Sequence, residues 1–184
     1  MTEPRIIPNL LGPSTFEYAQ SRFTDLGIHW YYMPVTSCEK DQMQYAGSFS
    51  HLIYKNGEPI SPLWDLSLQI LLAACDHHGE RLAEIARVRL GFCTRTPYAV
   101  EHTPHQDFQG PHRTGIYYPI TADGPTTIYA EKTEQLDGAY TLLASQQPRA
   151  NLWMDFDGEH FHSSTTPVDH ENRLVLTLNY RIQE

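Results

Sequence analysis

The chain has 184 residues and a mass of 21.1 kDa, which suits one domain with its own core and leaves little room for a second folded unit. A hydrophobic content of 40% and a charged content of 19% are typical of a globular protein and not of a disordered one. The net charge of −9 argues against nucleic acid or an anionic membrane as a partner, because both attract clusters of Lys and Arg.

Neither a membrane span nor a disulfide framework is expected. No apolar run approaches the roughly 18 to 20 residues that cross a bilayer, and residues 1–9 do not resemble a secretion signal. We therefore expect a cytoplasmic protein. Cys38, Cys75 and Cys93 are odd in number and form no CxxC pair, so we expect buried or idle thiols. The oligomeric state is left open.

Residues 1–84 are expected to form a mainly helical support region. Ser14 and Glu17 have the spacing of a capping box, and apolar residues then recur at helical intervals. This pattern predicts a first helix of about three turns that ends near Gly27.

Two further elements are expected in this first part. Residues 49–54 have the composition of a strand, which the Asn56-Gly57 turn would close. Ser61-Pro62 then opens a strongly apolar helix from residue 63 to about residue 76. We expect these helices to cover the outside of a sheet.

From residue 85 onward the chain is expected to be mostly extended. The expected strands cover residues 85–92, 100–107, 114–121, 126–130, 139–144, 150–156, a short piece near His162, and 173–182. Turn pairs such as Asp123-Gly124, Asp137-Gly138 and Asp157-Gly158 separate several of them, which is typical of a sandwich or jelly roll. In residues 173–182, large apolar side chains occupy every second position, so one face of that strand must be the inside.

A metal site is suggested by the single HxD pair in the chain, His105 and Asp107. Residues two apart on a strand point to the same side, so an imidazole and a carboxylate can converge on one ion. A His from a later strand would complete a two-His, one-carboxylate site, which occupies one face of an octahedral Fe(II) and leaves the opposite positions open. His160, His162 and His170 are the candidates for this third ligand.

The spacing along the chain to Arg173 favours His162 among these candidates for the third ligand. Ten residues separate His162 from Arg173, and here the sequence resembles the Fe(II)- and 2-oxoglutarate-dependent oxygenases. That family shows an HxD pair, a long gap, a distal His, and an Arg or Lys about ten residues later on the last strand of the barrel. The resemblance implies that His105, Asp107 and His162 hold Fe(II). It also implies that Arg173 pairs with the remote carboxylate of 2-oxoglutarate, which suits the forked donors of a guanidinium.

A second segment strengthens the resemblance. Residues 115–119 and 123–129 look like the "YYLN … GGxTxF" stretch of the prolyl hydroxylase branch, with Pro125 in place of the second Gly. By that similarity, Tyr118 would donate its hydroxyl to the same remote carboxylate as Arg173. Pro119 and the residue after it depart from the Leu-Asn of that branch, which weakens any inference to a particular substrate.

The resemblance covers about residues 85–182 and implies a mainly β fold, a double-stranded β-helix or jelly roll, with flanking N-terminal helices. It implies a dioxygenase that uses O₂ and couples the decarboxylation of 2-oxoglutarate to succinate and CO₂ with hydroxylation of a C–H bond. The expected substrate is an amino-acid or peptidyl side chain, or another small metabolite. Arg87 and Arg89, on one face of the strand before the metal pair, could reach an anionic substrate or could form a solvated face of the sheet.

Three other functions remain open from the sequence. A cupin-like isomerase or dioxygenase could use a similar metal barrel without 2-oxoglutarate, and would have no use for Arg173. A binding module that had lost catalysis would normally show an eroded metal site, whereas here all three ligands are present. A zinc hydrolase could use the same ligands, but the sequence offers no positioned Glu base for it.

Overall fold

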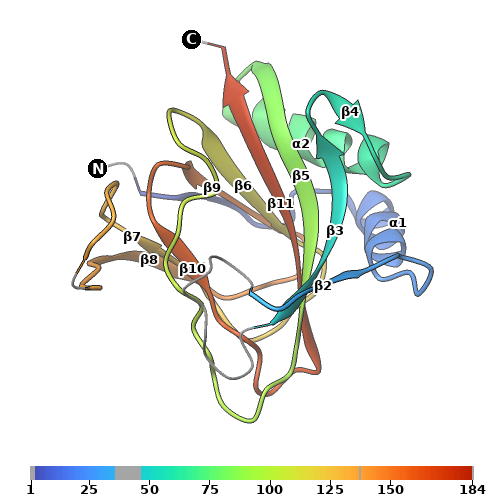
Figure 1. The fold of residues 1–184 in the computed structure, drawn as a ribbon. Helices are drawn as coiled ribbons and strands as arrows, with labels where there is room; N and C mark the ends of the chain where they lie inside the picture. The colour runs from blue at the N-terminus through green and yellow to red at the C-terminus, as the bar shows by residue number, and fades with distance from the viewer. Residues whose placement is uncertain (1–2, 36–46, 137, 184) are drawn as a thin grey trace.

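The computed structural model describes residues 3–35, 47–136 and 138–183, so Cys38 and Asp137 lie outside the described residues. The described chain forms two antiparallel β-sheets and two helices (Figure 1). In chain order the elements are β1 (Arg5–Ile7), α1 (Pro13–Phe23), β2 (Tyr31–Met33), β3 (Ser48–Lys55), β4 (Glu58–Pro59), α2 (Trp64–His78), β5 (Leu82–Thr94), β6 (Arg113–Tyr118), β7 (Thr126–Tyr129), β8 (Leu142–Gln146), β9 (Leu152–Asp157), β10 (His162–Ser164) and β11 (Asn172–Ile182).

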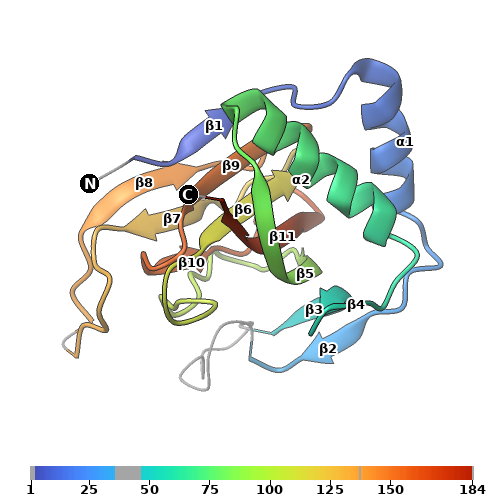
Figure 2. The same cartoon turned by 90° about the horizontal axis from the view of Figure 1, so that it is seen from above.

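The elements are arranged in three layers. The larger sheet has the strand order β1-β9-β6-β11-β5-β3-β2, with β4 paired to β3, and the smaller sheet has the order β10-β7-β8. Helices α1 and α2 cover one face of the larger sheet, and the smaller sheet lies on its other side (Figure 2). The expectation of a mainly β protein with flanking N-terminal helices is confirmed.

Each gap between layers holds a hydrophobic cluster. The cluster under the helices joins α1 and α2 to the larger sheet and includes Phe23, Ile70 and Leu176, all of them fully buried. The cluster between the sheets joins β6, β9 and β11 to β7 and includes Met154 and Ile128. No helix in the described part of the chain is long and apolar enough to cross a bilayer.

Strand β11 is buried on both of its faces because it lies in the middle layer. Its even-numbered residues from Leu174 to Tyr180 pack into the cluster under the helices. Its odd-numbered residues, Arg173, Val175, Thr177 and Asn179, face the other sheet. Strand β5 pairs with β11 in register, so its own odd-numbered residues lie beside them, from Arg87 opposite Asn179 to Cys93 opposite Arg173. Successive residues of a strand point to opposite faces, which explains this division.

Helix α1 differs at both ends from the expectation. It begins at Pro13, with Gly12 as N-cap, and no side-chain cap bond is made, so Ser14 lies inside the helix and does not form a capping box. Proline at the first helical position fixes the backbone angle that a helix needs, which explains the earlier start. The helix ends at Phe23 and not near Gly27: Thr24 leaves the helical backbone, with φ −102° and ψ 8°, and its hydroxyl donates to the carbonyl of Gln20.

Helix α2 and the hairpin before it agree with the expectation. Asn56 and Gly57 both have positive φ, at 56° and 84°, as a tight hairpin turn between β3 and β4 requires. Helix α2 ends against Gly79, whose φ of 67° places it in the left-handed region that favours glycine.

One expected strand is absent, and two strands occur that the sequence did not predict. The strand expected over residues 100–107 is absent: between β5 and β6 only isolated bridges form, at Glu101 and His105. Pro104 has no N–H to donate, so it interrupts the pairing with β10. The first 84 residues, expected to be mainly helical, also supply β1 and β2 to the larger sheet, in addition to β3 and β4 of the expected hairpin.

Candidate metal centre and its pocket

His105, Asp107 and His162 lie together between the two sheets. His162 begins β10, and His105 forms a bridge with it in which each backbone N–H donates to the other carbonyl at 3.0 Å. One ligand atom from each of the three side chains lies within 4.8 Å of the others. Backbone pairing therefore brings the two imidazoles together although 57 positions separate them in the sequence, from 105 to 162.

Hydrogen bonds fix how both imidazoles face the centre. The Nδ1 of His105 lies 3.1 Å from the carbonyl oxygen of Thr103, and the Nδ1 of His162 lies 3.3 Å from that of His160. A carbonyl oxygen only accepts, so each Nδ1 carries the hydrogen and each Nε2 keeps a free lone pair. Burial, together with the neighbouring His162, lowers the pKa of His105 to about 3, and burial also lowers the pKa of His162. Both rings are therefore neutral at pH 7, as metal ligands must be.

Asp107 is held as a carboxylate by three neighbours. Its Oδ1 accepts from Arg87 at 2.5 Å, its Oδ2 accepts from Asn179 at 2.9 Å, and Arg89 approaches to 3.6 Å. Burial acts to raise the pKa of Asp107, but Arg89 and Arg87 hold it well below the ordinary value. Its Oδ2 lies 3.9 Å from the Nε2 of His162, so it faces the imidazoles.

This donor set fits a divalent metal ion. Two neutral imidazoles and one carboxylate converge from one side, and residues behind them orient each ligand, as in known metal centres. The other candidate ligands lie elsewhere. His160 is not part of the group, and His170 pairs with Asp123 at 2.9 Å on a distant turn.

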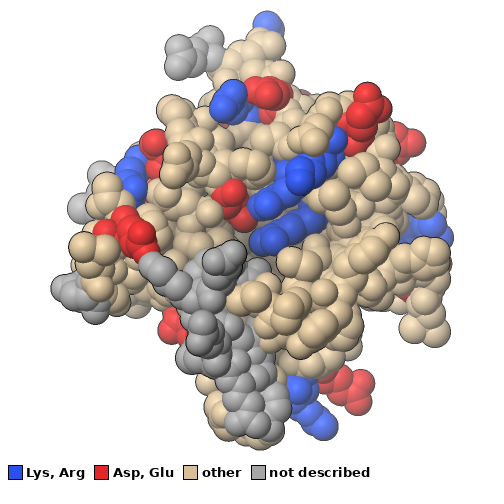
Figure 3. All heavy atoms as spheres, in the orientation of Figure 1, with Lys and Arg blue, Asp and Glu red and all other residues tan. Residues whose placement is uncertain are grey.

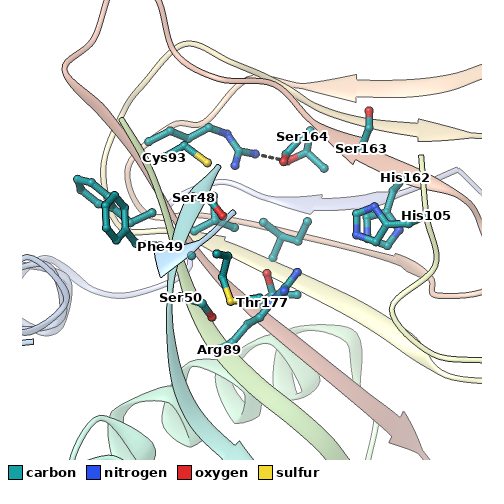
Figure 4. Close-up of a pocket in the computed structure, with 17 residues that line it drawn as sticks. Ser48, Phe49, Ser50, Arg89, Cys93, His105, His162, Ser163, Ser164 and Thr177 are labelled. Atoms are coloured by element: carbon teal, nitrogen blue, oxygen red, sulfur yellow. Dashed lines mark hydrogen bonds between the residues drawn. The ribbon is translucent and has the colours of Figure 1, made fainter. Parts of the chain in front are cut away.

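A pocket adjoins the two imidazoles, and Arg173 lines it (Figure 4). Arg173 is 4% exposed, and its Nε donates to the carbonyl of Gly124 at 2.7 Å while an Nη donates to Thr126 Oγ1 at 2.7 Å. The backbone of Gly124 can come this close to the turn that precedes β11 because it lacks a Cβ, which would lie 2.4 Å from the carbonyl oxygen of Thr165. The pocket thus joins the candidate metal ligands to one buried guanidinium.

Tyr118 is placed behind the wall of this pocket. It is fully buried, and its hydroxyl donates to Thr126 Oγ1 at 2.8 Å. Thr126, which the sequence did not single out, lines the pocket and lies between Tyr118 and the space where a ligand of Arg173 would bind.

Asn179 is another functional residue that the sequence reasoning missed. Its amide nitrogen donates to Asp107 and also to Thr114 Oγ1 at 3.2 Å. This second bond holds the amide in place beside Asp107. The available signal was the alternation along residues 173–182, since Asn179 shares a face with Arg173. A polar residue on a face that must be inside needs a partner there.

Comparison with known proteins gives the fold and not a close relative. No protein-family model matches the sequence, and no curated protein matches it significantly. Many solved structures match the fold. A prolyl-4-hydroxylase from Pseudomonas putida has a TM-score of 0.59 at 17% identity, covering 97% of this chain and 92% of that one. The α-ketoglutarate-dependent epimerase SnoN from nogalamycin biosynthesis has a TM-score of 0.66 at 13% identity, covering 96% and 75%.

A third match was solved with ligands. HygX from Streptomyces hygroscopicus, with nickel, 2-oxoglutarate and hygromycin B bound, has a TM-score of 0.60 at 13% identity, covering 97% of this chain and 82% of that one. The chain therefore has the jelly-roll fold of the Fe(II)- and 2-oxoglutarate-dependent oxygenases, and the resemblance found in the sequence is confirmed at the level of the fold.

Proposed function

We propose that this protein is an Fe(II)- and 2-oxoglutarate-dependent oxygenase, and that residues 1–184 act as one catalytic domain. The observation that carries the proposal is the shared pocket: two of the three candidate metal ligands and the buried Arg173 line the same space. A cupin-like barrel or a hydrolase would need the metal ligands but would have no use for a buried cation at this position. A binding module without catalysis would not need three intact ligands.

Each residue of the pocket has a role in this proposal. His105, Asp107 and His162 hold Fe(II), and Arg173 binds the remote carboxylate of 2-oxoglutarate, with Thr126 beside it and Tyr118 supporting Thr126. When bound, iron, 2-oxoglutarate and O₂ together supply the oxidising power, and 2-oxoglutarate becomes succinate and CO₂. The protein positions these groups and keeps water away from them. Apolar side chains of the pocket such as Ile116 and Val175 serve this exclusion.

The product of the reaction is proposed to be a hydroxylated C–H bond in an amino-acid or peptidyl side chain or in another small metabolite. The P. putida enzyme of the same fold is a prolyl-4-hydroxylase, which supports this outcome, while SnoN is an epimerase.

The proposal is tested by binding and turnover of 2-oxoglutarate. Under anaerobic conditions, titration of the Fe(II)-loaded protein should show saturable binding of 2-oxoglutarate. In air, succinate should accumulate, even if slowly, without a primary substrate. Asp107→Ala should lose iron and turnover, while Arg95→Gln, an exposed residue outside the pocket, should behave as the wild type. Absence of 2-oxoglutarate binding by the iron-loaded wild type would contradict the proposal.

A further inference from the structure

The pocket beside the metal centre is positively charged although the protein is acidic. Two arginines, Arg89 and Arg173, line it, and no Asp or Glu side chain does so within the described chain. The protein as a whole carries a net charge of −9. Figure 3 shows a strip of Lys and Arg side chains across this face, over β5 and β11. Arginines that line a pocket without any Asp or Glu in its described lining, on an otherwise acidic protein, indicate a site for an anion.

The two arginines are at opposite ends of the pocket. Arg173 pairs across the strands with Cys93, whereas Arg89 pairs with Thr177. Four residues along a strand correspond to roughly 13 Å. In Figure 4, Arg89 lies beside Thr177 and Ser50, away from Cys93. One anion bound at Arg173 therefore does not reach Arg89, whose one carboxylate neighbour among the described residues is Asp107 at 3.6 Å.

Arg89 differs from its neighbour Arg87 in its bonds. Arg87 donates to Asp107 and Asn179, and its guanidinium lies 4.7 Å from the centre of the Phe108 ring. Arg89 makes no side-chain hydrogen bond to any residue that the structure describes, and its nearest carboxylate oxygen is 3.6 Å away on Asp107. Its side chain is 28% exposed and lines the pocket, so it is accessible to a ligand. Arg87 is thus committed to the metal ligand, and Arg89 is available to a ligand.

Two hydroxyl groups lie beside the guanidinium of Arg89 (Figure 4). Ser50 and Thr177 line the same pocket from β3 and β11, whereas Ser48 lies toward Cys93, at the Arg173 end. Among the described residues, neither the Ser50 hydroxyl nor the Thr177 hydroxyl has a hydrogen-bond partner. A guanidinium with uncommitted hydroxyls beside it can bind a carboxylate by two parallel bonds and further single ones.

The charges of the site with Fe(II) and 2-oxoglutarate bound also indicate a second anion. This step rests on the proposed function. The two positive charges of Fe(II) balance the two negative charges of 2-oxoglutarate. The negative charge of Asp107 balances only one of the three arginines nearby, Arg87, Arg89 and Arg173. Positive charge therefore remains next to the reacting centre. We propose that the primary substrate is a small carboxylic acid whose carboxylate binds Arg89, with the C–H bond to be oxidised directed toward the metal.

This assignment narrows the substrates expected from the sequence. A free amino acid or a related small acid carries the required carboxylate close to its C–H bonds. A neutral residue inside a peptide chain does not. The short reach from Arg89 to Asp107 means that the carboxylate lies only a few bonds from the oxidised carbon.

The experiment compares acids with uncharged analogues on the protein loaded with Ni²⁺ and 2-oxoglutarate, which does not turn over. Ligand-observed NMR is recorded with a pool of free L-amino acids and small hydroxy acids, and then with the corresponding carboxamides. We expect at least one acid to bind and its carboxamide to bind at least about tenfold more weakly. Arg89→Gln should lower the affinity for the acid by a similar factor, and Arg89→Lys should recover part of it. Arg95→Gln should leave this affinity unchanged.

The affinity for 2-oxoglutarate, measured on the same variants, separates this inference from the proposed function. Arg89→Gln, compared at equal metal content, should change it by less than about threefold, because Arg173 holds that ligand and Arg87 still donates to Asp107. If Arg89→Gln instead removes 2-oxoglutarate binding, Arg89 belongs to the co-substrate site and the inference is wrong. It is also wrong if carboxamides or a neutral peptide bind as well as acids, or if no acid binds a protein that does bind 2-oxoglutarate. Should the wild type not bind 2-oxoglutarate at all, the proposed function fails first.

Discussion

Arg173 shows how one residue can be prepared for a ligand by its surroundings. The carbonyl of Gly124 and the hydroxyl of Thr126 hold the guanidinium in place, and the pocket reaches it from one side. Because the side chain is already ordered and largely desolvated, little ordering remains to be done when a carboxylate binds.

Replacing Arg173 should therefore affect 2-oxoglutarate and not the metal. Removing one partner of a charge-assisted pair inside a pocket costs on the order of 3 kcal/mol, or more than about a hundredfold in affinity. We expect Arg173→Ala to keep Fe(II) and lose 2-oxoglutarate, and Arg173→Lys to recover part of the affinity because an ammonium keeps the charge without the fork. Anaerobic isothermal titration measures both ligands. Wild-type affinity in Arg173→Ala would show that another residue binds the carboxylate.

The choice of His162 over His160 can also be tested at the level of single residues. His162 contributes its Nε2 to the ligand group, whereas His160 is buried two residues earlier and is not part of it. His162→Ala should lower Fe(II) affinity at least about a hundredfold, and His160→Ala should lower it by less than about tenfold. Metal content after dialysis gives the comparison. The reverse order would show that His160 is the distal ligand.

At the level of elements, β5 and β11 form one wall that supports both the core and the site. Their even-numbered residues belong to the cluster under the helices, and their odd-numbered residues hold Asp107 at one end and line the pocket toward the other. A shift of register by one residue would exchange the two sets, so core packing fixes the position of the site.

Strand β6 beside this wall depends on the absence of a side chain at Gly115. A Cβ there would lie 2.3 Å from the Trp153 indole and 3.2 Å from the Tyr180 ring, both buried. Gly115→Ala should therefore destabilise the fold by about 1–3 kcal/mol through overpacking. Gly91→Ala is the matched control, because a Cβ there meets only the carbonyl oxygen of Val175 at 3.8 Å. Urea unfolding compares the two variants, and equal midpoints would contradict the packing argument.

At the level of the whole molecule, a network of ion pairs joins the N-terminal strand β1 to its neighbours in the larger sheet and to the segment after α2. Arg5 on β1 donates to Asp155 on β9 and to Glu80 after α2, and Arg113 on β6 also donates to Asp155. Trp153 Nε1 donates to the other oxygen of Asp155 at 2.9 Å. The network lies on the side of the sheet away from the metal centre, so it serves stability rather than chemistry.

The contribution of Glu80 to stability should depend on pH. The hydrogen bond from Arg5 lowers the pKa of Glu80 below its ordinary value of 4.5, although burial acts against this. A carboxyl whose pKa is lower in the folded state adds stability above pH 4.5, and the addition is lost as the pH falls through the folded pKa. Glu80→Gln should therefore cost about 1 kcal/mol at pH 7, and this cost should shrink progressively as the pH falls below 4.5. Thermal unfolding of both proteins across this range gives the difference, and a constant difference would rule out the ion pair as its cause.

Local patterns and spacings in the sequence were enough for much of the fold. The alternation along residues 173–182 predicted a strand with an inner face, and the Asn56-Gly57 pair predicted the hairpin between β3 and β4. The cysteines expected to be idle, Cys75 and Cys93, are buried free thiols. These features depend on neighbours in the chain, so a single sequence contains them.

Tertiary structure decided what depends on residues far apart in the chain. The path of residues 100–107 follows isolated bridges to the segment around β10 and not a strand of its own, and β1 and β2 form only because the larger sheet offers edges. Packing of β5 beside β11 also decided that Arg87 donates a hydrogen bond to Asp107 while Arg89 lines the pocket. The sequence by itself determined the order and types of the candidate ligands. Only packing could decide their partners, because a hydrogen bond depends on distance in space and not on separation along the chain.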